Sequence, residues 1–212
     1  MLTNLANLLT LSRIAAIPLV IGAFYIEGPL GNWIGFGIYA AACITDFFDG
    51  YVARAWSQQS AVGRFLDPVA DKLLVAALLL MLVATSRIPG VAVLPAVVIL
   101  CREILVSGLR EFLATAQVRV PVSKLAQWKT TVQMLALGFL LVGTAGPDFG
   151  PLSTTEVGVW GLWIAAILTL VTGYDYLRVG LHHVDRMDSD AAAARSQEHA
   201  GASRTPATTD VR

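Results

Sequence analysis

Six apolar stretches, separated by short segments rich in Gly, Pro and charged residues, dominate this sequence. A helix that crosses a bilayer needs roughly 20 mostly apolar residues, and the loop signals divide the chain into pieces of about that size. The stretches run approximately over Leu8 to Ile26, Trp33 to Tyr51, Leu66 to Thr85, Val91 to Leu113, Trp128 to Val142 with its flanks, and Val157 to Tyr176. Because 56% of the 212 residues are hydrophobic and only 14% are charged, we predict an all-α integral membrane protein with six transmembrane helices.

The distribution of Lys and Arg predicts the orientation of these helices. If both termini are cytoplasmic, every Lys and Arg except Arg87 lies in a cytoplasmic segment or near the cytoplasmic end of a helix. The first stretch lacks a small-residue cleavage site and a positive region before it, so we expect a retained span rather than a signal peptide. We therefore expect a six-helix transmembrane domain over residues 1–184 and a disordered cytoplasmic tail over residues 185–212.

Several function classes find little support in the composition. The formal net charge is zero and no basic block with interleaved aromatic residues is present, so nucleic-acid binding is not expected. Cys43 and Cys101 lie inside predicted helices, which favours reduced, structural thiols over a disulfide. His182 and His183 have no acid or Cys at ligand spacing nearby, which favours anchoring at the membrane interface over metal binding.

Four aspartates interrupt the second and third apolar stretches within 26 residues. Asp46 and Asp49 are three residues apart, and Asp67 and Asp71 are four apart, so each pair projects from one face of a helix. A carboxylate at membrane depth costs a few kcal/mol or more, so the four should face an interior and share a cation. Oxygen ligands without His or Cys indicate Mg²⁺ or Mn²⁺, and four carboxylates are typical of two ions.

Small residues accompany the acids and leave room for a phosphate-bearing ligand to approach the backbone. They are Gly50, Ala53 and Gly63. Arg54 offers two donors to a phosphate, and Pro68 in a first helical turn predicts Asp67 as an N-cap. The alternative is that the acids form structural ion pairs with Arg54, Arg64 and Lys72. That alternative does not require small residues at fixed intervals among the acids.

The complete pattern, Asp46-x2-Asp49-Gly50-x2-Ala53-Arg54-x8-Gly63-x3-Asp67-x3-Asp71, resembles the signature of the CDP-alcohol phosphatidyltransferases. The resemblance implies a metal-dependent transferase of phospholipid biosynthesis, with residues 1–184 as its catalytic domain. It also implies that Asp46, Asp49, Asp67 and Asp71 bind two Mg²⁺ or Mn²⁺ ions and that Asp71 acts as general base. The CDP-binding positions that it implies are Asn7, Thr10, Asp46, Asp49, Gly50, Ala53, Arg54, Gly63 and Asp67.

Outside the signature, three further motifs resemble the bacterial phosphatidylglycerophosphate synthases of that family. These motifs are Asn7-x2-Thr10-x2-Arg13-x4-Pro18, Arg102-Glu103-x6-Arg110-Glu111 and Lys129-Thr130-Thr131-x-Gln133. The resemblance implies an acceptor site at Arg13, Arg102, Arg110 and Lys129. The first motif alternatively supplies a helix cap and an interfacial Arg, and Arg110 alternatively contacts anionic lipid headgroups. Ala126-Gln127 departs from the Gly-Lys that is frequent in the subfamily and leaves one cation fewer near the acceptor.

The expected reaction is transfer of a phosphatidyl group from CDP-diacylglycerol to sn-glycerol 3-phosphate, which gives phosphatidylglycerophosphate and CMP. The resemblance further implies a multi-pass protein of the inner (cytoplasmic) membrane, a site facing the cytoplasm and a homodimer. One alternative is a sister enzyme with another acceptor, namely a cardiolipin, phosphatidylserine or phosphatidylinositol-phosphate synthase. An ion-coupled transporter is a second alternative, but the acids gather near one face of the membrane rather than along a path across it.

Overall fold

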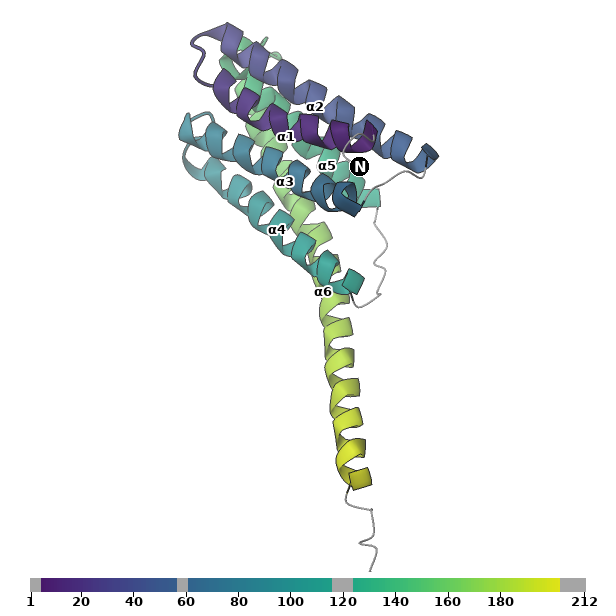
Figure 1. The fold of residues 1–212 in the computed structure, drawn as a ribbon. Helices are drawn as coiled ribbons and strands as arrows, with labels where there is room; N and C mark the ends of the chain where they lie inside the picture. The colour runs from purple at the N-terminus through teal and green to yellow at the C-terminus, as the bar shows by residue number, and fades with distance from the viewer. Residues whose placement is uncertain (1–4, 57–60, 116–123, 203–212) are drawn as a thin grey trace, which may run out of the picture.

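The chain folds into a helical bundle with one helix much longer than the others (Figure 1). A computed structural model describes residues 5–56, 61–115 and 124–202. In these ranges the secondary structure comprises six α-helices and two 3₁₀ turns. They are α1 (Leu5–Ala23), α2 (Pro29–Trp56), α3 (Ala61–Ala84), η1 (Gly90–Ala92), α4 (Val93–Thr115), α5 (Lys124–Val142), η2 (Gly143–Ala145) and α6 (Thr154–Ala202).

Consecutive helices run up and down, so the turns after α1, α3 and α5 gather at the end of the bundle opposite the start of α1 and the extension of α6 (Figure 1). Helix α1 packs against α2 and α3, whereas α6 packs against α5 and α4, and α2 meets α5 between these two groups. The core is almost entirely aliphatic, which is what helices with apolar faces bury when they pack. Its fully buried members include Leu78, Leu82, Ile99, Leu137, Leu140 and Leu162.

Two glycines bring α6 close to α5. A Cβ atom added at Gly161 would lie 3.0 Å from the Cβ of Ala136, and one added at Gly158 would lie 2.7 Å from Cγ of Leu140. Such small residues let helix backbones approach closely, which favours association where the surroundings are as apolar as the side chains. The close packing of α5 against α6 therefore fixes the relative positions of polar residues such as Lys129 and Thr172.

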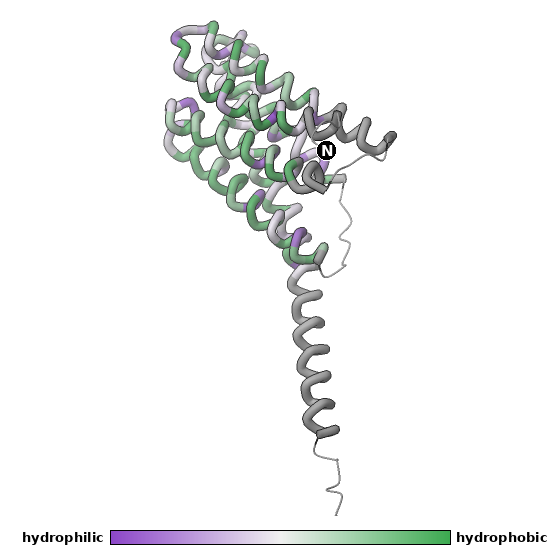
Figure 2. The backbone as a smooth tube through the Cα atoms, in the orientation of Figure 1, coloured by the Kyte–Doolittle hydropathy of each residue, from purple (hydrophilic) through white to green (hydrophobic). Residues whose placement is uncertain are grey.

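The outer surface is apolar, as the six apolar stretches predict. Large hydrophobic side chains point outward from α4 and α6, among them Leu94, Ile104, Ile164 and Ile167, and the tube in Figure 2 is mostly green along α4. Within the described residues, Gly90–Ala114 and Thr154–Arg178 are long and apolar enough to cross a membrane. Each of the six predicted stretches falls largely within one helix, while the number of membrane crossings stays a prediction.

One expectation about a helix end was wrong. Asp67 is not an N-cap, because α3 begins at Ala61 and Pro68 lies inside the helix. Proline in a helix removes one backbone hydrogen bond, a loss that neighbouring helices can offset. Helix α6 continues to Ala202, past residue 184, while the division into a transmembrane domain and a tail stays a prediction. An alanine run, Ala191–Ala194, gives this segment high intrinsic helix propensity.

Arg87 joins four segments at the turn end of the bundle. Its Nη1 donates to the carbonyl of Leu141 at 2.6 Å, and its Nη2 donates to Oδ1 of Asn32 at 2.5 Å. The guanidinium also lies 4.9 Å from the ring centroid of Phe24, and Asn32 Nδ2 donates to the carbonyl of Val142 at 2.9 Å. The one cation that the Lys and Arg distribution left unexplained is therefore held by neutral partners.

Candidate functional site

Arg13 on α1 lies between an acid of α2 and an acid of α3, and we call these three residues the Arg13 cluster. Its Nη2 lies 2.5 Å from Oδ1 of Asp46, and its Nη1 lies 2.7 Å from Oδ1 of Asp71. The Arg13 side chain is only 2% exposed, whereas those of Asp46 and Asp71 are 35% and 46% exposed. The first and last acids of the signature thus converge on one buried cation while remaining open to water.

The other positions of the signature lie on the same helices, but their side chains are outside the described part of the structure. Asp49 follows Asp46 by one turn of α2, and Asp67 precedes Asp71 by one turn of α3. The remaining predicted positions with a described backbone only are Asn7, Gly50, Ala53, Arg54 and Gly63. The helices thus retain the spacing that directs each pair of acids from one face, and the contacts of these side chains stay untested.

The residues present fit a divalent cation. Carboxylate oxygens of Asp46 and Asp71 reach one shared positive group across the α2–α3 interface, so the same oxygens can share a hard cation. No group of three metal-ligating side chains occurs among the described residues. These residues include the side chains of only two of the four acids, Asp46 and Asp71. A complete metal site therefore requires Asp49 and Asp67.

Thr10 lies one turn before Arg13 on α1. Thr10 is 1% exposed and Arg13 is 2% exposed, so both point into the bundle. Their spacing of three residues places both side chains on one face of α1, as a polar stripe facing the interior requires. The interfacial alternative for Arg13 is wrong, because its guanidinium contacts two carboxylates instead of water or headgroups.

A second polar group, the Glu103 cluster, comprises Arg102 and Glu103 of α4, Lys129 of α5 and Thr172 of α6. Lys129 pairs with Oε1 of Glu103, Arg102 Nη1 lies 3.5 Å from the same oxygen, and Arg102 Nη2 donates to Oγ1 of Thr172 at 3.0 Å. Adjacent helical residues point in different directions, but the Arg102 side chain is long enough to reach its neighbour Glu103.

Arg110 joins the predicted cations from the next turns of α4. Its guanidinium lies 5.6 Å from the ring centroid of Tyr176 on α6, one helical turn from Thr172, which accepts a hydrogen bond from Arg102. Three of the four predicted acceptor residues are therefore close to one another. The fourth, Arg13, lies with Asp46 and Asp71 instead.

Polar residues of α6 belong to this region and were missed in the sequence. Thr169, Thr172 and Tyr176 are at most 5% exposed and are spaced by three and four residues, which is a polar stripe within an apolar stretch. Buried polar atoms of Arg102, Gln133, Thr169 and Tyr176 have no hydrogen-bond partner within the described residues. Buried polar atoms are nearly always satisfied, so this region has capacity for water or a polar ligand.

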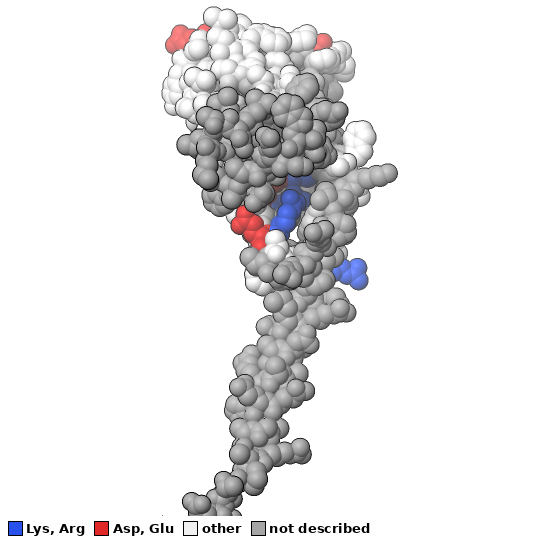
Figure 3. All heavy atoms as spheres, turned by 45° about the vertical axis from the view of Figure 1, so that its right-hand side comes forward, with Lys and Arg blue, Asp and Glu red and all other residues white. Residues whose placement is uncertain are grey.

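Lys72 contacts α4. Its Nζ donates to Oγ of Ser107, which links α3 to α4. On the face drawn in Figure 3, the described surface of the bundle is mostly uncharged; blue side chains appear toward the end from which α6 extends, and red side chains appear at both ends. The Arg13 and Glu103 clusters thus account for most of the charge that the described residues bury.

Comparison with known proteins agrees with this arrangement. The model of the family described as CDP-alcohol phosphatidyltransferase matches residues 3–171. A Rickettsia bellii protein named CDP-diacylglycerol–glycerol-3-phosphate 3-phosphatidyltransferase is 50% identical over 175 residues, 82% of this chain and 94% of that protein. A Cereibacter sphaeroides protein of the same name is 36% identical over 214 residues, 85% of this chain and 97% of that one.

A plant relative carries a different name. A rice (Oryza sativa subsp. japonica) protein named cardiolipin synthase (CMP-forming) is 43% identical over 191 residues, 84% of this chain and 57% of that protein. All fixed positions of the signature are present in the chain, and two of its acids meet at one buried cation. With a family model that spans most of its length, the chain belongs to the CDP-alcohol phosphatidyltransferase family.

Proposed function

We propose that this protein transfers the phosphatidyl group of CDP-diacylglycerol to sn-glycerol 3-phosphate, forming phosphatidylglycerophosphate and CMP. The observation that carries the proposal is the convergence of Asp46 and Asp71 on the buried Arg13, in a chain 50% identical to a protein named for this reaction. An acid pair that is partly open to water and balanced by a cation suits a site where a hydroxyl is deprotonated beside a diphosphate.

Asp71 accepts the proton of the attacking hydroxyl in this mechanism. Its 46% exposed side chain is accessible to a soluble acceptor, and the bond from Arg13 Nη1 to Oδ1 fixes the orientation of the carboxylate. Mg²⁺ or Mn²⁺, held by Asp46, Asp49, Asp67 and Asp71, would supply neutralisation of the charge that develops on the diphosphate. Arg54 and the small residues of the signature position the CDP group.

The acceptor phosphate binds near Arg102, Arg110 and Lys129 in this proposal. Arg102 and Lys129 already contact Glu103, so the phosphate must compete with a carboxylate for them. The buried polar atoms of Gln133 and Thr169 that have no described partner are further groups that a polar ligand, or water around it, can satisfy.

The proposal also includes six membrane crossings, with both termini in the cytoplasm of the inner membrane, and a homodimer. The acids and the Lys- and Arg-rich segments share the end of the bundle from which α6 extends (Figure 1). This charge asymmetry supports a cytoplasmic site, where a membrane-bound CDP-lipid and a soluble phosphate ester can meet.

An acceptor screen tests the proposed function. Purified protein is incubated with CDP-diacylglycerol and Mg²⁺ or Mn²⁺, and CMP release is measured with each acceptor in turn. We expect turnover with sn-glycerol 3-phosphate. The plant relative's name makes phosphatidylglycerol the main competing acceptor. Turnover with phosphatidylglycerol, serine or inositol phosphate, and none with sn-glycerol 3-phosphate, would overturn the acceptor assignment while leaving the family assignment intact.

Replacing Arg110 with Ala tests the acceptor site. Hydrogen bonds to charged groups contribute about 1.5–3 kcal/mol, so we expect the KM for sn-glycerol 3-phosphate to rise about tenfold or more with kcat little changed. Arg110 is suitable because it is exposed and because its printed contact is with a neutral ring, so its loss leaves no buried charge unpaired. The matched control is Arg178→Ala, which removes an exposed Arg of α6. An unchanged KM in the Arg110 variant would return this residue to contact with lipid headgroups.

A further inference from the structure

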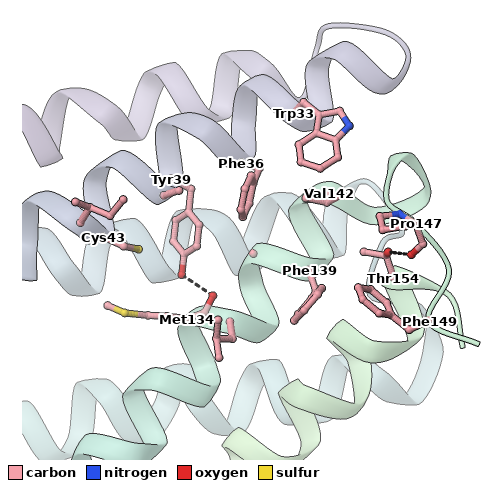
Figure 4. Close-up of a pocket in the computed structure, with 14 residues that line it drawn as sticks. Trp33, Phe36, Tyr39, Cys43, Met134, Phe139, Val142, Pro147, Phe149 and Thr154 are labelled. Carbon is pink, nitrogen blue, oxygen red and sulfur yellow. Dashed lines mark hydrogen bonds between the residues drawn. The ribbon is translucent and has the colours of Figure 1, made fainter.

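A cavity of about 440 Å³ lies between α2 and α5, next to the loop that follows η2. Figure 4 shows aromatic side chains of α2 directed toward α5, with Met134 and Phe139 on the opposite wall. Its lining is almost entirely apolar. The hydroxyl of Tyr39 donates to the carbonyl of Met134 at 3.1 Å, so this polar group is satisfied within the wall. The volume lies within the range of small-molecule sites, and the chemistry favours an apolar occupant.

One end of the cavity lies beside the Arg13 cluster. Cys43 lines the cavity, and the charges of Asp46, Asp71 and Arg13 all act on its thiol. Asp46 follows Cys43 by three residues on α2, so the two side chains project from the same face of the helix. A ligand with a charged head at Asp46 can therefore extend an apolar tail along α2 into the cavity.

The other end is bounded by an aromatic pair. Trp33 and Phe36 pack edge to face with their ring centroids 5.9 Å apart, and both line the cavity. Lining residues of α2 extend from Trp33 to Ile44, which corresponds to about 16 Å along the helix at 1.5 Å per residue. The cavity is thus long and narrow, as a hydrocarbon chain requires.

We infer that this cavity binds one acyl chain of the diacylglycerol part of the CDP-lipid, with the Trp33–Phe36 pair limiting the chain length. This inference rests on the proposed function, since that function supplies a lipid whose polar end belongs at Asp46 and Asp71. A hydrocarbon chain gains from leaving water or loosely packed surroundings for a close-fitting apolar site. A polar occupant would find few hydrogen-bonding groups along these walls, since the hydroxyls of Tyr39 and Thr154 already donate to backbone carbonyls.

Two neighbouring alanines of α2 provide the test. Ala40 lines the cavity, whereas Ala41 is exposed on another face of the same helix. Ala40→Phe fills the cavity, and Ala41→Phe adds the same bulk outside it. CDP-lipids with short (dilauroyl) and long (dipalmitoyl) chains compete in one assay, and the ratio of their kcat/KM values is measured. Each methylene kept out of an apolar site reduces affinity by about fourfold, so we expect Ala40→Phe to disfavour the long chain by tenfold or more and Ala41→Phe to leave the ratio unchanged.

A second variant tests the limit on chain length in the opposite direction. Trp33→Ala opens the far end of the cavity, so we expect it to accept CDP-lipids with chains longer than palmitoyl better than the unchanged protein does. Equal chain-length ratios in the unchanged protein and in the Ala40 and Trp33 variants would overturn the inference. Such a result would mean that bulk lipid or a second copy of the chain, rather than an acyl chain of the substrate, occupies the cavity.

Binding without acceptor separates this inference from the proposed function. Radiolabelled CDP-dipalmitoylglycerol is bound at equilibrium to the Ala40→Phe and Ala41→Phe variants in detergent. Weaker binding by the first variant alone supports the acyl-chain site, and equal binding contradicts it. If the unchanged protein releases no CMP with any acceptor, the proposed function fails, and the binding comparison still decides whether the cavity takes an acyl chain.

Discussion

Asp71→Asn is expected to lower kcat by about a hundredfold or more, because general base catalysis typically contributes factors of that size or larger. The amide oxygen of Asn can still accept the hydrogen bond that Arg13 Nη1 now donates to Oδ1, so the fold should persist. CMP release is measured at saturating CDP-diacylglycerol and sn-glycerol 3-phosphate. Retention of more than about a tenth of the activity would contradict the assignment of Asp71 as the base.

Asp148→Asn is the matched control for this substitution. Asp148 is exposed in the loop between η2 and α6, at the end of the bundle opposite the Arg13 cluster (Figure 1). The same chemical change there should leave kcat unaltered. Melting temperatures of the two variants, compared with that of the unchanged protein, check that the loss of activity does not come from unfolding.

Arg13→Leu is expected to cause a large loss of stability that divalent cations partly restore. Breaking a buried ion pair by removing one partner costs about 3–5 kcal/mol, which corresponds to a fall in Tm of about 10 °C for a protein of this size. Asp46 and Asp71 would then repel each other with no cation between them. Because a ligand that binds only the folded state stabilises it, Mn²⁺ should raise the Tm of this variant more than that of the unchanged protein.

Arg87→Leu is the control that separates stabilisation by Mn²⁺ at the acids from the general effect of losing a half-buried Arg. Arg87 contacts a carbonyl, an amide oxygen and an aromatic ring, so its removal leaves no uncompensated carboxylate. We expect a lower Tm here too, but no added stabilisation by Mn²⁺. Equal responses of the Arg13 and Arg87 variants to Mn²⁺ would argue against a divalent cation at Asp46 and Asp71.

The sequence predicts the helices well and their ends poorly. Apolar stretches locate all six described helices because burial and length leave a strong compositional signal. Asp67-Pro68 resembles a helix start, yet α3 extends past it to Ala61. The local pattern could not reveal this, because the backbone bond lost at a proline is offset by tertiary packing that a sequence window does not contain.

Pairing between distant helices is likewise hard to predict. Spacing places Asp46 and Asp49 on one face, but only the packing of α1 against α2 and α3 brings Arg13 between Asp46 and Asp71. The sharing of Glu103 by Lys129 and Arg102 depends on side-chain reach between α4 and α5. The stripe of Thr169, Thr172 and Tyr176 on α6 was detectable from its periodicity, since three polar residues on one face of an apolar helix need partners.

Two hydrogen bonds hold α2 and α5, the two main walls of the cavity, in one register. Tyr39 donates to the carbonyl of Met134 at 3.1 Å, and Asn32 Nδ2 donates to that of Val142 at 2.9 Å. A slip of one residue along the helix axis shifts both donors by about 1.5 Å and so lengthens or bends both bonds. Asp46 and the Trp33–Phe36 pair lie on the same helix, so the distance between them is fixed by α2 itself, and the bonds to α5 keep the opposite wall of the cavity in register with it. The length of the cavity is therefore set when the protein folds, before any lipid binds.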